Sequence, residues 1–261
     1  IRGPAAYCGT VVLKPTYGLI SRRGVFPLSY TLDHCGPLTR SVEDAAITTE
    51  MLAGFDPLDP ASADKPVVDL RTGLEDGVAG LRVGMPRNLY RDAEGLSPEV
   101  YDAIERVGQA LEAAGAIVEE VTLPDYSLFN ACGRVILTAE AFAIHEKDLR
   151  ERPQDYGELF LMRIVTGAAI SSADYIQAQR LRRELSMAVN REALKTYDVL
   201  LTACALGPAP AFADCPPDRP MFWPIQTMPF NVTGNPALSM PAGLSASGLP
   251  LSAQIVGRPF D

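Results

Sequence analysis

Histidine is scarce in this sequence, since His34 and His145 are the only two among 261 residues. The sequence also contains no G-x-S-x-G, no H-E-x-x-H, no P-loop and no G-x-G-x-x-G motif. A Ser-His-Asp triad is therefore unsupported, and nothing indicates a zinc protease or a nucleotide-binding site. We expect no metal ion and no cofactor, and we assign His34 a structural hydrogen-bonding role.

Charge and apolar runs argue against two classes of partner. The formal net charge is −9 and no block of lysine and arginine occurs, so nucleic-acid binding by a basic face is not expected. No apolar run approaches the ~18 residues of a membrane span. We expect a small-molecule substrate, with neither nucleic acid nor a membrane as partner, and the sequence leaves a homodimer open.

The cysteines are widely spaced and form no C-x-x-C pair, so neither a zinc site nor a redox motif is expected. Their odd number and wide spacing are typical of free thiols in a reducing compartment. We therefore expect free, mostly buried thiols and a cytoplasmic protein. The five residues are Cys8, Cys35, Cys132, Cys204 and Cys215.

The stretch 1–37 is rich in glycine and proline, which favours a tightly turned, ordered loop region over a helix. Beyond it, a strand over 81–85, a helix from Ser97 and a strand over 116–121 follow one another. A helix between two strands at this spacing indicates an α/β architecture. Further helices are expected over 41–54, 126–149 and 172–197, the last being the longest helical candidate, and further strands over 198–202, 236–240 and 251–256.

Two blocks of motifs carry a resemblance to a known family. The first reads I-R-G-P-A-A-Y-C-G over 1–9, L-K-P-T-Y-G over 13–18 and L-D-H-C-G-P over 32–37. The second reads F-N-V-T-G-N-P-A-L-S over 230–239. The chain resembles the amidase signature family, serine hydrolases that cleave carboxamides. This resemblance implies an α/β fold, a mixed sheet with helices on both faces, which we treat as one partial domain over 1–261, incomplete at both ends.

The resemblance also implies a mechanism. In the family, a serine activated by a lysine through a bridging serine attacks the amide carbonyl, and backbone N–H groups stabilise the oxyanion. By the motif, this nucleophile lies one position before Ile1, and the lysine, the bridging serine and the oxyanion loop lie further upstream. We therefore expect no catalytic residue among the 261 and no activity from them alone. Lys14 does not match the catalytic lysine, and we treat it as structural.

The same resemblance implies which residues border the substrate. Arg2 and Gly3 follow the expected nucleophile, although Arg2 also fits the role of a loop anchor. The segment near the second block borders the acyl or leaving-group pocket in family members, although its aromatic residues fit a core role too. Two arginines fit anchors for an acidic substrate group. The candidate substrate-binding residues are Arg2, Gly3, Arg134, Arg163, Trp223, Ile225, Phe230 and Asn231.

Two other functions are compatible with the motifs. The first is the glutamine-hydrolysing subunit of a tRNA-dependent amidotransferase. Arg163 resembles the substrate-binding arginine of that subunit, but Pro224 stands where it has an aspartate, and Gly133 and Arg134 stand where it has an aromatic pair. We therefore favour a generic carboxamide over glutamine. The second is a non-catalytic binding module that keeps the fold.

Overall fold

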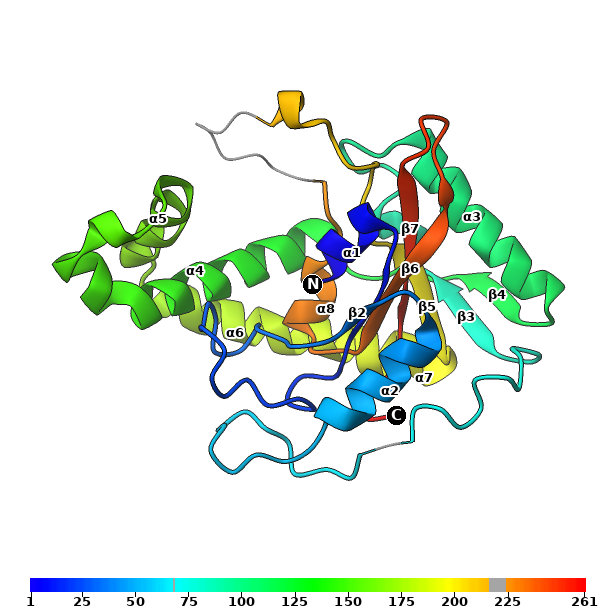
Figure 1. The fold of residues 1–261 in the computed structure, drawn as a ribbon, viewed down its shortest axis with the longest axis horizontal. Coiled ribbons are helices and arrows are strands. Elements are labelled where there is room, and N and C mark those ends of the chain that lie inside the picture. Colours follow the sequence, from blue (N-terminus) through cyan, green and yellow to red (C-terminus); the bar gives the residue numbers. More distant parts are fainter. Residues whose placement is uncertain (68, 216–223) are drawn as a thin grey trace.

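Among the residues that the structure describes, seven strands form one sheet in the order β2-β1-β6-β7-β5-β3-β4. The computed structural model describes residues 1–67, 69–215 and 224–261. Pairing within the sheet is mixed, since β3 runs parallel to β4 and β5 and the other pairs are antiparallel. The strands are β1 (Val11–Lys14), β2 (Leu38–Thr39), β3 (Arg82–Met85), β4 (Ile117–Glu120), β5 (Val199–Ala203), β6 (Ala237–Leu244) and β7 (Pro250–Val256) (Figure 1).

The parallel part of the sheet forms where the sequence predicts it. Helix α3 (Pro98–Ala113) follows Ser97 and connects β3 to β4. Pro98 occupies the first turn, where a missing backbone N–H costs no helical hydrogen bond. Val100, Ala103 and Ile104 form the buried side of α3, a spacing typical of one helix face. A helix is the usual connection between parallel neighbours, so this unit confirms the α/β prediction.

Helices cover both faces of the sheet, as predicted. Gln254 in β7 accepts a hydrogen bond from Arg2 of α1 (Arg2–Cys8). Leu201 in β5 lies next to Gly108 of α3 and pairs with Ile255, the neighbour of Gln254. Successive residues of a strand point to opposite faces, and directly paired residues share a face. Helices α1 and α3 therefore lie on opposite sides of the sheet.

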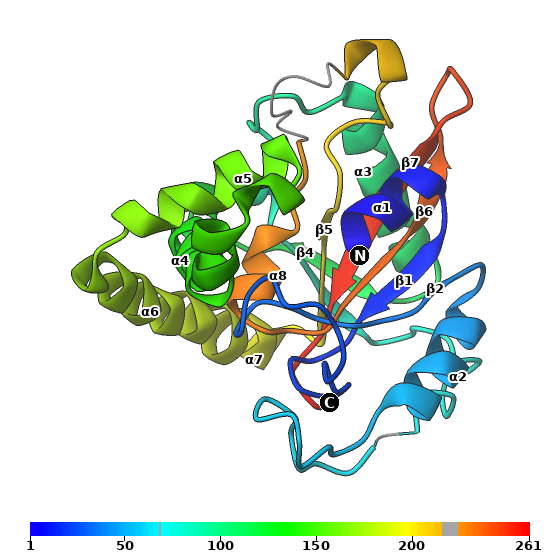
Figure 2. The same cartoon turned by 60° about the vertical axis from the view of Figure 1, so that its left-hand side comes forward.

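A layer of helices stands beside the sheet (Figure 2). Helix α4 (Tyr126–Glu151) contacts α6 (Ser172–Met187), α5 (Glu158–Ile164) and α8 (Met228–Val232). By length and composition alone, α4 could cross a membrane, and the bent pair 158–169 and 172–196 is a second candidate; core helices of soluble proteins pass the same test. The apolar residues of α4 are explained by its contacts with these neighbouring helices.

Two predictions of secondary structure were wrong. Residues 2–8 form α1 rather than loop, because Pro4 lies in the first helical turn, where its missing N–H has no partner to lose. The helix predicted over 172–197 is interrupted by a π-helical turn, Ala188–Ala193, before the short α7 (Leu194–Thr196). The longest helix is therefore α4, with 26 residues against 16 in α6.

The helix predicted over 41–54 forms as α2 (Val42–Leu52) and illustrates how local signals set an element's bounds. The Ser41 hydroxyl accepts a hydrogen bond from the Asp44 backbone N–H at 3.0 Å, which satisfies one of the free donors at the helix start. Glu43 and Asp44 place negative charge in the first turn, where the helix dipole favours it.

Candidate functional site

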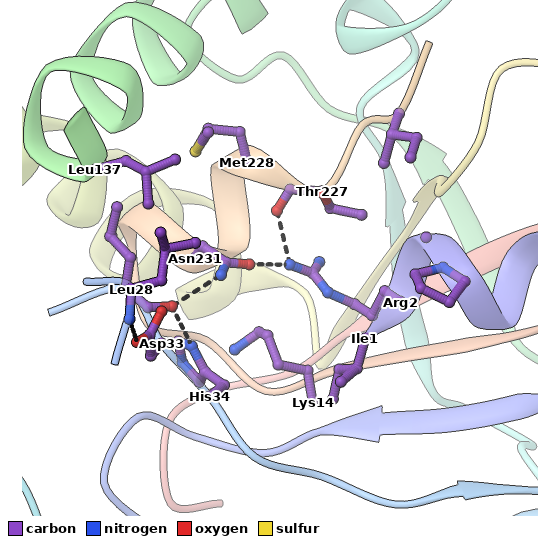
Figure 3. A pocket seen from close by; sticks show the side chains of 14 residues that line it. Ile1, Arg2, Lys14, Leu28, Asp33, His34, Leu137, Thr227, Met228 and Asn231 are labelled. Carbon is purple, nitrogen blue, oxygen red and sulfur yellow. Dashed lines mark hydrogen bonds between the residues drawn. The ribbon is translucent and has the colours of Figure 1, made fainter. Parts of the chain in front are cut away.

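A cavity of about 340 Å³ lies between α1, β1, the loop 28–34 and the start of α8. We call it the inner cavity. Both motif blocks contribute to it, the first through Arg2, Lys14 and His34 and the second through Asn231 (Figure 3). Residues more than 190 positions apart thus line one space, which is what the resemblance implies for a substrate site.

Arg2 is buried beside this cavity and binds only uncharged acceptors. Its guanidinium donates to the Thr227 carbonyl at 2.7 Å, and also to the side-chain oxygens of Asn231 and Gln254. The Phe230 ring centre lies 6.0 Å from its central carbon. Because burial disfavours the charged form, the pKa of Arg2 is lowered to about 10, so the group remains a cation at neutral pH.

Lys14 adds a second buried nitrogen. It ends β1, is 1% exposed, and donates a hydrogen bond from Nζ to the Pro15 carbonyl at 3.1 Å. Burial, followed by the nearby charge of Arg2, lowers the pKa of Lys14 well below its usual value. Figure 3 shows its side chain extending into the space between Arg2 and His34.

His34 has a fixed tautomer. Its Nδ1 lies 2.8 Å from the Leu32 carbonyl oxygen, which can only accept, so Nδ1 carries the proton. Nε2 is then an acceptor, and this buried atom has no hydrogen-bond partner within the described part of the chain. Burial and the charge of Lys14 lower the pKa of His34 to about 2. A neutral acceptor therefore lies at the same cavity as the Arg2 guanidinium and the Lys14 amine.

The loop 28–34 is held in place by a buried carboxylate of α4. Glu140 accepts hydrogen bonds from the Ser29 hydroxyl at 2.5 Å and from the Thr31 N–H and hydroxyl at 3.0 and 2.9 Å. Arg182 of α6 donates to the Thr31 hydroxyl at 2.8 Å and to its carbonyl at 3.0 Å. Asn231 donates to the Leu32 carbonyl at 2.9 Å. This network positions His34 and Asp33 at the cavity.

A second cavity of about 880 Å³ lies between α4, α5 and the segment 88–94, and we call it the outer cavity. It is lined by Arg134 of α4 and Arg163 of α5, both exposed. Four residues line both cavities, so the two cavities adjoin there. They are Leu137, Ile225, Thr227 and Met228.

The predicted substrate-binding residues divide into three groups. The inner cavity is lined by Arg2, Gly3, Ile225 and Asn231. The outer cavity is lined by Arg134 and Arg163, and also by Ile225. Phe230 is fully buried in the core beneath Arg2. Trp223 lies outside the described residues. Whether any of these side chains binds substrate stays a prediction.

Sequence reasoning missed part of the inner cavity. Lys14 and His34 were assigned structural roles, and each makes the hydrogen bond of such a role, yet both also line the cavity. Their position inside the first motif block was the available signal. Leu137 and Met228 carried no signal, because only the packing of α8 on α4 brings them to the cavity.

The five cysteines are all free, as predicted, but only Cys132 and Cys204 are buried, so the expectation of mostly buried thiols was wrong. Among the described residues, no group of three or more histidine, cysteine or acidic side chains could hold a metal ion. The polar groups of the inner cavity instead suit an uncharged organic ligand. The donors of Arg2 and Lys14 match a carbonyl oxygen, and the His34 acceptor matches an N–H group.

Comparison with known proteins identifies relatives along the whole chain. The family model described as Amidase matches residues 1–261. The A subunit of glutamyl-tRNA(Gln) amidotransferase from Geobacter sp. (strain M21) is 37% identical over 286 residues, which cover 100% of this chain and 58% of that protein. The protein of the same name from Trichlorobacter lovleyi is 38% identical over 288 residues, with the same coverage. The chain thus spans about 58% of the length of these curated relatives.

Solved structures give the same result. The crystal structure of the A subunit of glutamyl-tRNA(Gln) amidotransferase from Thermotoga maritima superposes with a TM-score of 0.85 at 32% identity, covering 100% of this chain and 56% of that one. A protein from a vestigial complex related to the origins of an s-triazine catabolic enzyme gives a TM-score of 0.90 at 32% identity, over 100% of this chain and 57% of that one. With the family model matching over its full length, the chain belongs to the amidase family, the amidase signature enzymes.

Proposed function

We propose that these 261 residues form the substrate-binding part of an amidase that hydrolyses carboxamides to an acid and ammonia or an amine. The observation that carries the proposal is the hydrogen bond between Arg2 and Asn231, which joins the two motif blocks at one cavity. The donors of Arg2 and Lys14, together with the His34 acceptor, suit the carbonyl and N–H groups of a carboxamide. In this proposal the serine nucleophile precedes Ile1 in a longer polypeptide, which carries the catalytic lysine and the bridging serine as well.

The complete reading frame tests this proposal. We expect the codon before Ile1 to encode serine, and the purified full-length protein to release ammonia from simple primary amides. Replacement of that serine by alanine is expected to lower kcat by at least about 10³-fold, because the nucleophile and its base act as a unit. The chain 1–261 alone is expected to be inactive. Another residue in place of the serine would exclude this mechanism and favour a non-catalytic binding module.

Glutamine is the second candidate substrate, favoured by the names of the curated relatives. Arg134 and Arg163 line the outer cavity and could bind the α-carboxylate of glutamine while its carboxamide enters the inner cavity. Pro224 and Gly133 still depart from the pattern of the amidotransferase subunit. If glutamine is the substrate, activity requires or is raised by a partner protein, and the protein acts in the cytoplasm.

Substitution of Arg163 distinguishes the two substrates. For glutamine, we expect Arg163→Gln to lower kcat/KM by about 10- to 100-fold, as loss of a charged hydrogen bond does. For a neutral amide such as propionamide, the same change is expected to have little effect. Arg183→Gln is the matched control, since Arg183 is an exposed arginine of α6 that lines neither cavity. Equal losses on both amides would exclude a carboxylate anchor at Arg163.

A further inference from the structure

The place where the two cavities adjoin lies beside a close contact of two helices, α4 and α8. Met228 begins α8 and lines both cavities, opposite Lys14 and His34 (Figure 3). On its other side lies Gly133, a buried residue of α4. A Cβ atom at Gly133 would lie 2.2 Å from the Met228 sulfur, 2.7 Å from its Cγ and 3.0 Å from a methyl of Val232. The missing side chain of Gly133 therefore makes the room that Met228 occupies.

An added methyl group would force Met228 to move. Separations under 3.0 Å are far below van der Waals contact, and the first atoms met belong to a flexible thioether rather than to backbone. Gly133 and the rest of α4 close one side of Met228. The open sides are the two cavities that it lines. A displaced Met228 would thus move into the space where the two cavities adjoin.

We propose that the inner and outer cavities join through an opening beside Met228, and that Gly133 and Met228 together set its width and so select amides by the bulk of the group that passes through it. This inference rests on the proposed amidase function. The substrate class it names is a carboxamide whose amide group enters the inner cavity of about 340 Å³ while a larger remainder occupies the outer cavity of about 880 Å³. Amides small enough for the inner cavity do not use the opening.

The experiment compares kcat/KM of the full-length protein for a small amide, propionamide, and a bulky one, 3-phenylpropanamide. In Gly133→Ala, we expect the ratio of bulky to small to fall at least about tenfold, equivalent to about 1.4 kcal/mol in the barrier. Adding Met228→Ala to that variant is expected to restore the ratio, because the displaced side chain is gone. An unchanged ratio in Gly133→Ala would overturn the proposal.

Gly108→Ala is the matched control. Gly108 is a helical glycine of α3 whose added Cβ would also face a methionine sulfur, that of Met85, at 3.1 Å. That contact lies in the core and lines neither cavity. Its substitution is therefore expected to leave the ratio of bulky to small amide unchanged. A similar fall in both variants would show a general packing defect and overturn the proposal.

Two further variants apply if Gly133→Ala fails to fold. With Gly133 kept, Met228→Ala is expected to raise the ratio of bulky to small amide and Met228→Phe to lower it; the same ratio in both would overturn the proposal. If wild-type protein hydrolyses neither amide, the proposed function fails by itself. Binding of 3-phenylpropanamide to the two variants then tests this inference. We expect the affinity of Met228→Ala to be at least about tenfold higher than that of Met228→Phe. Equal affinities would refute the inference.

Discussion

Two buried or half-buried arginines of this molecule have opposite surroundings. Arg87, beside α3, binds both carboxylate oxygens of Glu105 at 2.7 Å and lies 3.4 Å from Glu120. Arg2, at the inner cavity, binds only the oxygens of Thr227, Asn231 and Gln254. Within the described chain, neither Arg2 nor Lys14 forms an ion pair. The carboxylate pair raises the pKa of Arg87, whereas burial lowers that of Arg2 to about 10.

The difference indicates what each arginine does. The charge of Arg87 is neutralised by its neighbours, so its contribution is to hold β3, α3 and β4 together. The charge of Arg2 is compensated only by dipoles, and it remains available to attract a negative or partly negative group in the inner cavity. Burying such a cation costs free energy, and the hydrogen bonds to three acceptors from two chain segments offset part of that cost.

Substitution of the two arginines gives the largest expected effect. We predict that Arg2→Met lowers the free energy of unfolding by about 3–5 kcal/mol, because buried Gln254 and half-buried Thr227 and Asn231 all lose their donor. Arg87→Met is expected to lower it by about 1–2 kcal/mol, since Glu105 and Glu120 can turn to solvent. Urea unfolding measures both. Equal losses would contradict the contrast between the two sites.

Glu140 is a buried carboxylate bound by hydroxyl and backbone N–H donors, whereas Glu146 of the same helix is paired with an exposed arginine. The two residues therefore repeat the comparison of Arg2 and Arg87 with negative charges. Glu140→Gln places an amide among the Ser29 and Thr31 donors, and we expect a loss of about 2–4 kcal/mol in the free energy of unfolding. Hydrogen exchange in the loop 28–34 is expected to accelerate while β6 and β7 stay protected. Glu146→Gln on the same helix, where Glu146 pairs only with exposed Arg150, is the control and is expected to change stability by less than about 0.5 kcal/mol. Unchanged exchange in the loop would mean that Glu140 does not position it.

His34 gives a smaller, pH-dependent effect. Burial, Lys14, Arg2 and Arg22 lower its pKa from 6.5 to about 2, with an opposing hydrogen bond to the Leu32 carbonyl. Below pH 6.5 the unfolded chain therefore binds a proton that the folded protein excludes until about pH 2, and stability falls as pH falls through that window. From pH 7 to pH 5, we expect wild type to lose roughly 2 kcal/mol more than His34→Gln. Urea unfolding at both pH values measures this, and equal losses would place His34 in contact with solvent.

The sequence predicted a helix correctly where the residues that start it lie within a few positions of one another. Ser41 and Asp44 cap α2, and Pro98 starts α3, because each interaction spans only a few residues. The helix at 2–8 was missed because its glycine and proline residues were taken as signs of a loop. Pro4 lies in the first helical turn, where proline does not interrupt a helix. The break after α6 was missed because its π-helical turn contains Asn190, whose side chain exchanges hydrogen bonds with Asn235.

The sequence by itself determined the family and the α/β fold. The family follows from the motifs and the fold from helical periodicity and capping residues, and each of these signals is contained in a short stretch of the chain. Only the tertiary structure decided that Arg2 keeps an unneutralised charge, that Glu140 holds the loop beside it, and that Met228 lies over Gly133 between two cavities. Each of these depends on contacts between residues roughly a hundred or more positions apart. Such contacts are set by how the helices pack on one another and on the sheet, and no short stretch of sequence encodes them.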